Sequence, residues 1–236
     1  MLVILSAFTS FITAAFGIGG GVVLVGVLAI LLPAAALIPV HALVQTGSNT
    51  GRLFIMRAHV EWSFFPSIFL GTLLGAVLGG FIAVGLSAQS VQIGVGAFIL
   101  FSVYMKTPGM GRSAGWLVSA IASFLAMFFG ATGPFVAAYV SALKLGRMEH
   151  VATHSAFMTT QHLLRVLVFG FLGFAFGPYL FLIVAMIASG FAGTIIGRQV
   201  LMRIDDRKFR LALNAILTVL ALRLIWSGVS TSLGFE

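Results

Sequence analysis

The chain has 236 residues, of which 60% are hydrophobic and only 8% are charged, and its mean hydropathy is +1.16. Soluble domains carry about 25% charged residues, so this composition excludes an ordinary soluble domain and indicates an all-α polytopic membrane protein embedded in a lipid bilayer. The net charge of +8 is attributed to basic loops that set the membrane topology. We therefore expect no nucleic acid as a partner. Because the chain has no cysteine, disulfides and thiolate metal sites are excluded.

Eight apolar runs follow one another along the chain, and about 20 residues are needed to cross a bilayer. They cover residues 2–32, 38–58, 63–85, 90–105, 113–144, 149–172, 176–197 and 209–228. The first and fifth runs are too long for a simple crossing, and glycines interrupt them at 16–21 and 129–134. Each of these two runs predicts either one kinked helix or a re-entrant pair of half-helices.

The two interruptions occupy the same place in a duplicated unit. An offset of 113 residues (154 − 41) pairs His41 with His154 and Arg52 with Arg165. The same offset also pairs Ser6 with Ser119, Ser10 with Ser123, Phe11 with Phe124 and Thr46 with Thr159. We therefore predict two repeats within one integral membrane unit, residues 1–112 and 113–236, each with a broken hairpin and three transmembrane helices. Paired broken helices indicate a transport site near the bilayer midplane.

The basic residues indicate how the runs are oriented. Eleven of the 13 gather in four places: Arg52 and Arg57; Lys106 and Arg112; Lys144 and Arg147; Arg198, Arg203, Arg207, Lys208 and Arg210. If the first and fifth runs enter the membrane and return, all eleven lie on one face, which the positive-inside rule makes cytoplasmic. This arrangement predicts six full crossings, both termini outside, and repeats inverted relative to each other. Eight plain crossings remain the alternative.

Two further patterns of small residues predict helix contacts and not ligand binding. They are Gly71-x3-Gly75-x3-Gly79 and Ser189-x3-Gly193-x3-Gly197. This spacing places all three small residues on one helix face, where they allow two backbones to approach closely.

In the re-entrant arrangement, the second half-helix of each hairpin begins near the middle of the membrane. The beginnings are predicted at Gly19, Gly20 and Gly21 in the first repeat, and at Thr132 and Gly133 in the second. A helix start has about four unpaired backbone N–H groups and the positive end of the helix dipole. Two such starts facing each other would form a pocket suited to an anion.

The runs that follow the two breaks carry a second group of polar residues. His41, Gln45, Asn49 and Arg52 share one helical stripe in the first repeat, as do His154, Gln161, His162 and Arg165 in the second, where Met158 replaces the glutamine. Polar groups in hydrocarbon usually face the bundle interior and mark a substrate path. Arg52 is equally compatible with an interface position at its helix end, and His41 with a helix start near the outer surface.

The five acidic residues all lie in loops or at ends: Glu61, Glu149, Asp205, Asp206 and Glu236. A membrane site without a carboxylate favours anions over metal cations. A coupling proton would have to be carried by His41, His154 or His162. Three histidines are also sufficient for a zinc site, although the chain has no His-Glu-x-x-His motif.

The break from Phe16 to Gly21, the stretch from Pro39 to Arg52 and their weaker counterparts in the second half resemble the TauE/SafE family of membrane permeases. The resemblance covers essentially the whole chain. It implies a bacterial inner-membrane permease that exports sulfite, organosulfonates such as sulfoacetate, or related small anions. In such a membrane, the outside, where the basic residues place both termini, is the periplasm. The second break, Gly-Ala-Thr-Gly-Pro, departs from the triple-glycine form, so the two half-sites are expected to contribute unequally.

We therefore expect a secondary transporter that moves a small anion by alternating access, with neither enzymatic activity nor a cofactor. The alternatives are a passive anion channel and a histidine-based metal-ion carrier. The predicted substrate-binding residues are Gly19, Gly20, Gly21, His41, Gln45, Asn49, Arg52, Thr132, Gly133, His154, Gln161, His162 and Arg165.

Overall fold

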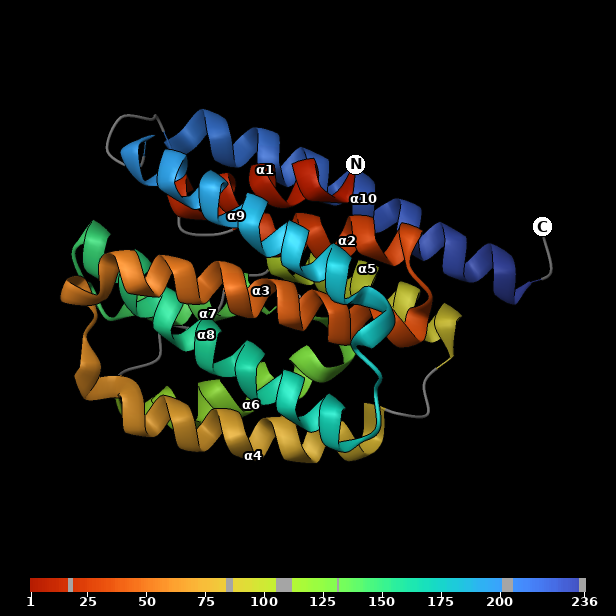
Figure 1. Cartoon of the computed structure of the whole chain (residues 1–236), viewed down its shortest axis with the longest axis horizontal. Helices are drawn as coiled ribbons and strands as arrows, with labels where there is room; N and C mark the ends of the chain where they lie inside the picture. The colour runs from red at the N-terminus through yellow and green to blue at the C-terminus, as the bar shows by residue number, and fades with distance from the viewer. Residues whose placement is uncertain (17–18, 84–86, 105–111, 131, 201–205, 234–236) are drawn as a thin grey trace.

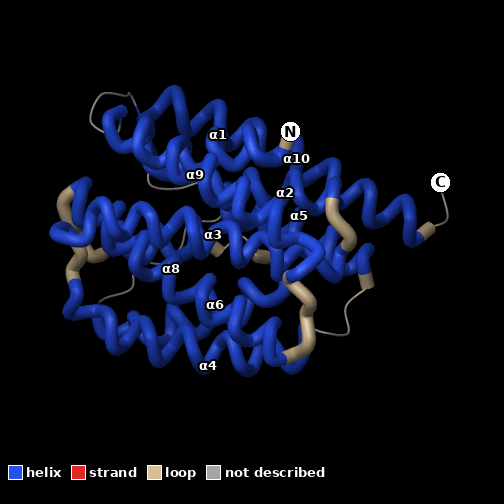
Figure 2. The backbone as a smooth tube through the Cα atoms, in the orientation of Figure 1, coloured by secondary structure: helices blue, strands red, loops and turns tan. Residues whose placement is uncertain are grey.

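The computed structural model describes residues 1–16, 19–83, 87–104, 112–130, 132–200 and 206–233, and all regular secondary structure in these ranges is helical (Figure 2). The first half contains α1 (Leu2–Phe16), α2 (Gly20–Leu31), α3 (Ala34–Met56), α4 (Phe65–Ala83) and α5 (Ala88–Tyr104). The second half contains α6 (Gly115–Phe129), α7 (Gly133–Ala142), α8 (Arg147–Phe171), α9 (Leu180–Val200) and α10 (Asp206–Ser232). The predicted all-helical class is confirmed for the described residues.

Both predicted interruptions are breaks between helices. The first lies between Phe16 and Gly20 and the second between Phe129 and Gly133. The four flanking helices have 15, 12, 15 and 10 residues, which correspond to about 22, 18, 22 and 15 Å. Each is therefore too short to cross a ~30 Å hydrocarbon core alone. Gly17, Ile18 and Ala131, which were also assigned to the breaks, lie outside the described residues.

Each broken pair folds back on itself as a helical hairpin, so the kinked-helix alternative is wrong. A Cβ atom on Gly20 would lie 2.6 Å from the carbonyl carbon of Thr9, whereas a continuous helix would separate these residues by ~16 Å. In the second pair, a Cβ atom on Gly115 would lie 2.9 Å from Oη of Tyr139, where a continuous helix would give ~36 Å.

The two halves pack together through reciprocal pairs of helices. α1 of the first half packs against α9 of the second, and α6 of the second half packs against α4 of the first (Figure 1). In the centre α3 pairs with α8, and α5 pairs with α10. These main contacts between the halves are thus reciprocal, because α1 and α6, and α4 and α9, occupy equivalent places in the two halves.

Both small-residue patterns lie in these helix contacts, as predicted. On α4, Gly71 and Gly75 face the backbone carbonyls of Trp116 and Ala120 on α6 so closely that a side chain would collide with them. On α9, Gly193 faces the carbonyl of Ala7 on α1 in the same way. The Ser189 hydroxyl donates a hydrogen bond to the Val3 carbonyl at 2.7 Å.

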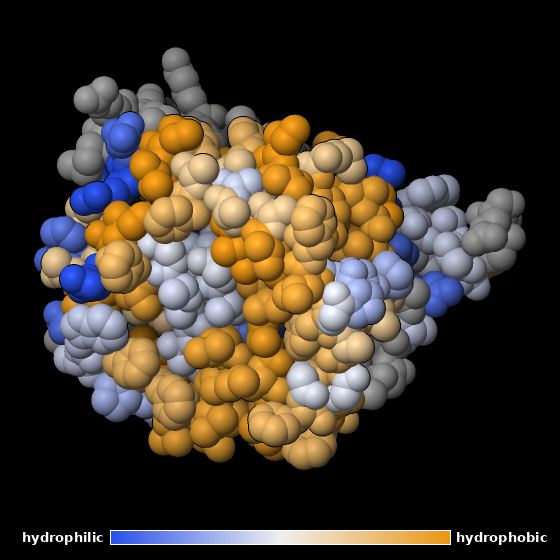
Figure 3. Space-filling view, in the orientation of Figure 1, coloured by the Kyte–Doolittle hydropathy of each residue, from blue (hydrophilic) through white to orange (hydrophobic). Residues whose placement is uncertain are grey.

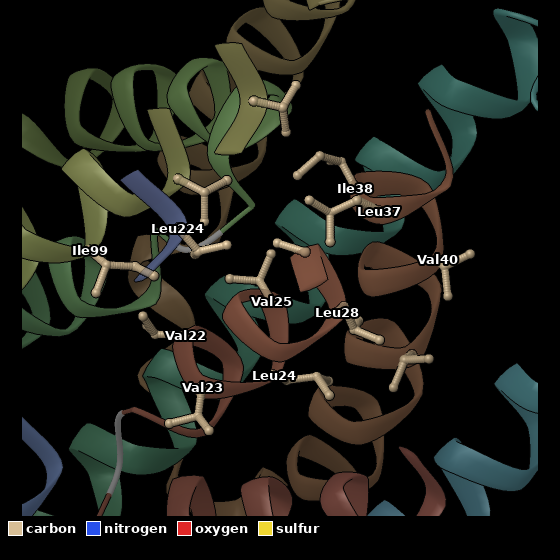
Figure 4. Close-up of a cluster of buried hydrophobic side chains, with 14 of the residues drawn as sticks. Val22, Val23, Leu24, Val25, Leu28, Leu37, Ile38, Val40, Ile99 and Leu224 are labelled. Carbon is tan, nitrogen blue, oxygen red and sulfur yellow. The ribbon is translucent and has the colours of Figure 1, made fainter. Parts of the chain in front are cut away.

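The largest apolar core surrounds α2, the second arm of the first hairpin. The close-up of this core includes Val22, Val23, Leu24, Val25, Leu28, Leu37, Ile38, Val40, Ile99 and Leu224 (Figure 4). These side chains come from α2, α3, α5 and α10, so a short helix from the first half is enclosed by long helices from both halves. The core thereby fixes the position of the first break.

The outer surface is also apolar, as a lipid-facing surface must be. The face seen in Figure 3 is largely apolar, and the exposed side chains include Phe69, Phe81, Phe181 and Phe191. Two helical segments in the described ranges, Trp62–Ile82 and Gly177–Gln199, are long and apolar enough to cross a membrane. α3 and α8 are longer than a typical span, at 23 and 25 residues, but they carry polar side chains along their buried faces.

Candidate functional site

The two breaks meet at one small cavity. Its volume is about 20 Å³. It is lined by Thr13, Gly19, Gly21, Val22, His41, Gln45, Asn49, Gly130, Gly133, Pro134, His154, Met158 and His162. This volume has room for about one water molecule. The structure therefore has a closed site that must widen before it can hold a polyatomic ion.

Two histidines, one from each repeat, hold the starts of the two half-helices. His41 Nε2 donates a hydrogen bond to the carbonyl oxygen of Gly21 at 3.0 Å, and His154 Nε2 donates to that of Gly133 at 3.2 Å. Because a carbonyl can only accept, the proton of each neutral ring is on Nε2 and Nδ1 is a bare acceptor. Neither Nδ1 atom has a hydrogen-bond partner among the described residues.

α3 begins earlier than the apolar run suggested, and this places His41 inside the molecule. The helix starts at Ala34, directly after Pro33, and Pro39 lies in its second turn. His41 is therefore a buried residue inside the helix, and the alternative that made it a helix-start residue is wrong.

The two predicted arginines are also buried, with exposed fractions of 2% for Arg52 and 0% for Arg165. Arg52 Nη1 donates to Asn49 Oδ1 at 3.0 Å and reaches Ser155 Oγ at 3.5 Å. Arg52 is thus enclosed by protein, as an inward-facing residue would be. Arg165 Nη1 lies 3.5 Å from the Gly130 carbonyl oxygen, while its Nε and Nη2 have no partner among the described residues.

No carboxylate is among the described hydrogen-bond partners of either arginine. A buried guanidinium without a counter-ion costs several kcal/mol, which hydrogen bonds to neutral groups offset only in part. The site thus carries positive charge that a bound anion would neutralise.

Polar groups from α8 complete the second half of the site. The Thr132 hydroxyl donates to Gln161 Oε1 at 3.0 Å, so Thr132 does not cap the start of α7. Gln161 Nε2 and both ring nitrogens of His162 have no hydrogen-bond partner among the described residues. The His162 ring meets that of His41 edge-on, with centroids 5.7 Å apart. Several donors are therefore buried close to the cavity without a partner.

The start of α2 depends on glycines for two different reasons. Gly19 has φ = 102°, a left-handed conformation that glycine adopts without strain. Gly20 does not line the cavity, and a Cβ atom there would collide with the Thr9 carbonyl oxygen and with Thr13 Oγ1. Gly20 is thus a packing residue of the hairpin and not a lining residue.

The predicted site residues fall into two groups in the described part of the chain. Those that line the cavity are Gly19, Gly21, His41, Gln45, Asn49, Gly133, His154 and His162. Those that lie around the lining are Gly20, Arg52, Thr132, Gln161 and Arg165. Thr13 lines the cavity but is not among the residues predicted from the sequence, and its hydroxyl donates a hydrogen bond to the Thr9 carbonyl at 3.0 Å. Its repeat counterpart is Ala126, so the duplication did not indicate it.

A metal site finds no support in this geometry. No group of three His, Cys, Asp or Glu side chains among the described residues is arranged to hold a metal ion. Nothing there favours the metal-carrier alternative.

Two broken helices that meet at a buried polar cavity are the architecture in which secondary transporters bind their substrates. The family model of the sulfite exporter TauE/SafE family matches residues 2–224. The chain therefore belongs to this family of membrane transporters, as the sequence resemblance predicted. No curated protein and no solved structure gives a match.

Proposed function

We propose that this protein is a secondary transporter that exports a small anion, such as sulfite or an organosulfonate, by alternating access. The observation that carries this proposal is the set of groups around one cavity: two half-helix starts, unpartnered polar side chains and two buried arginines. Helix starts and arginines both favour negative charge. The substrate would bind between Gly21 and Gly133, with Arg52 and Arg165 compensating its charge.

The proposed topology follows from the reciprocal packing. Residues 1–112 and 113–236 would be inverted repeats, each a re-entrant hairpin followed by three membrane-spanning helices. The basic loops would face the cytoplasm and both termini the periplasm of the inner membrane. A reporter fused after the last residue tests this arrangement: phosphatase activity in the periplasm is expected, and fluorescence of a cytoplasm-dependent reporter would contradict it.

Alternating access is supported by a difference between the two ends of the molecule. A cavity of about 260 Å³ lies at the start of α3, with Ala35, Ile38 and Pro39 in its wall. The offset of 113 residues relates these three positions to Met148, Val151 and Ala152. At that second location Val151 and Ala152 are buried with Met56 in an apolar cluster, against which Met148 packs.

We interpret these two places as the two entrances to the site, of which the first is hollow and the second is closed. An exchange of conformation between the two repeats would close the first entrance and open the second, as alternating access requires.

The absence of native cysteine makes this exchange measurable. A cysteine at Ala35, which is exposed, should react with a membrane-impermeant maleimide, whereas one at Ala152, which is fully buried, should react only when substrate is transported. Equal labelling of A35C and A152C without substrate would refute the closed entrance.

The transport activity itself is tested by uptake of radiolabelled sulfite and sulfonates into proteoliposomes. Saturable flux is expected, and Arg165→Ala should reduce it at least tenfold while Arg165→Lys, which keeps the charge, retains more activity. Flux that rises linearly with concentration would favour the passive channel, and saturable transport of a divalent metal would favour the metal carrier.

A proton could be coupled to this movement. The bare Nδ1 atoms of His41 and His154 are the acceptors through which a proton would enter the site. A pH gradient across the liposome membrane should then drive anion accumulation, and a gradient without effect would exclude proton coupling.

A further inference from the structure

The two halves of the cavity carry different residues at two pairs of positions that the repeat relates to each other. Gln45 on α3 corresponds to Met158 on α8 (158 − 45 = 113), and both line the cavity. Gly21 at the start of α2 corresponds to Pro134 at the start of α7, and both line it as well. The first half therefore offers a side-chain amide (Gln45) and a backbone N–H (Gly21). The second half has a thioether (Met158) and a proline nitrogen without a hydrogen (Pro134) at the same positions.

Met158 and Gln45 occupy matching places beside the two half-helix starts. The methyl carbon Cε of Met158 lies 3.9 Å from the position of a Cβ atom on Gly133. The amide nitrogen of Gln45 lies against Gly21, one residue further along the other half-helix start, so closely that a Cβ atom on Gly21 would collide with it. Each side chain thus extends over the start of its own half-helix, at the wall of the cavity.

The two side chains differ in their surroundings. Met158 belongs to an apolar cluster with Val136, Tyr139 and Phe157 and is 4% exposed. The side-chain amide of Gln45 makes no hydrogen bond among the described residues, and its neighbour Asn49 accepts one from Arg52. A ligand between them would meet an apolar wall on the α8 side and a free amide on the α3 side.

We propose that Met158 determines specificity, so that the site prefers an anion with one apolar substituent over an equally charged anion with a polar substituent. This inference rests on the proposed function and narrows its substrate class. A polar substituent placed against the thioether would lose its hydrogen bonds to water without gaining a partner, whereas a methyl group would gain packing contacts. A contact of this kind discriminates by on the order of 10- to 100-fold.

The test compares methanesulfonate with sulfamate, two monoanions of similar shape that differ by a methyl and an amino group. Initial uptake rates into proteoliposomes are measured for both anions with the wild-type protein and with three variants. Wild type and Met158→Leu should prefer methanesulfonate at least tenfold. Met158→Gln, whose side chain has nearly the same length, should lower or reverse this preference, because the new amide supplies hydrogen bonds to the amino group.

The double exchange Gln45→Met with Met158→Gln is the matched control. It keeps the composition of the cavity and moves the apolar wall to the other half, so the preference for methanesulfonate should return. Melting temperatures verify that each variant is folded.

The outcomes separate this inference from the proposed function. Wild-type uptake of sulfamate equal to or faster than methanesulfonate overturns the role of Met158, even if Met158→Gln does not fold. The same rate ratio in wild type and folded Met158→Gln also overturns it. Folded wild-type protein that transports no anion at all refutes the proposed function instead.

Discussion

Replacing Gly20 by alanine is expected to push α2 away from α1. The new Cβ atom would lie 2.6 Å from the Thr9 carbonyl carbon and closer still to the Thr9 carbonyl oxygen. Carbon atoms in contact prefer a separation of about 3.5 Å or more, so the start of α2 has to retreat by at least ~0.9 Å (3.5 − 2.6), and by more to clear the oxygen. Excess packing costs about 1–3 kcal/mol, and the cost here lies toward the upper end because the helix backbone of α1 cannot rotate away.

Gly133→Ala is the matched control, because Gly133 is the repeat counterpart of Gly20 (133 − 20 = 113). The nearest atom to its added Cβ is Met158 Cε at 3.9 Å, an ordinary contact. The gain from restricting the unfolded chain, about 0.4–1 kcal/mol, is offset because Gly133 precedes Pro134, and a residue with a Cβ atom is disfavoured in a helical conformation before proline. In detergent, Gly133→Ala should therefore melt close to the wild-type temperature.

Gly20→Ala should melt several degrees below wild type in the same assay. A loss of about 3 kcal/mol corresponds to ~6–12 °C for a chain of this size. Equal melting temperatures for the two variants would refute this prediction, because the Thr9 carbonyl beside Gly20 is expected to cause the whole difference in melting temperature.

Three further outcomes follow from the structure. Gly130→Ala should lose about 1–2 kcal/mol of stability in thermal unfolding, because φ is 71° at this position and alanine is strained there; an unchanged melting temperature would contradict this. Gly193→Val should prevent α9 from packing on α1, where the Ala7 carbonyl leaves no room, and a folded monodisperse peak in size-exclusion chromatography would argue against it. A transported anion at 100 times its Kd should raise the stability of the wild type by about 2.7 kcal/mol but that of Arg165→Ala much less, whereas an equal rise in both would exclude Arg165 from the site.

The sequence predicted the breaks and much of the cavity lining because these features leave local signals. Glycine runs interrupt apolar segments, and the repeat relates His41 to His154 and Arg52 to Arg165 from the sequence alone. The signal at Pro39 was misleading, since proline is tolerated early in a helix and α3 starts five residues before it.

The role of Gly20 could not be predicted from local sequence. Three successive glycines carry the same signal, but only the position of α1 decides which of them packs and which faces the cavity. Gly20 meets Thr9 on the neighbouring helix, while Gly21 lies beside Gln45 and lines the site. The fold-back of each hairpin was likewise one of two alternatives, because a break in a helix does not set the direction in which the chain continues.

The arginines connect the closed state to the proposed transport cycle. Arg52 and Arg165 are buried beside a cavity with room for about one water molecule, and no carboxylate is among their described partners. Closing the empty site therefore keeps two charges away from both water and a counter-ion, at a cost of several kcal/mol per ion. Closing the site around an anion would offset that cost, because the anion would neutralise the charge of the arginines and accept hydrogen bonds from the unpartnered donors. In the proposed cycle the loaded site would close more easily than the empty one, so movement of the protein would be tied to movement of the substrate, as in a carrier and unlike a leak.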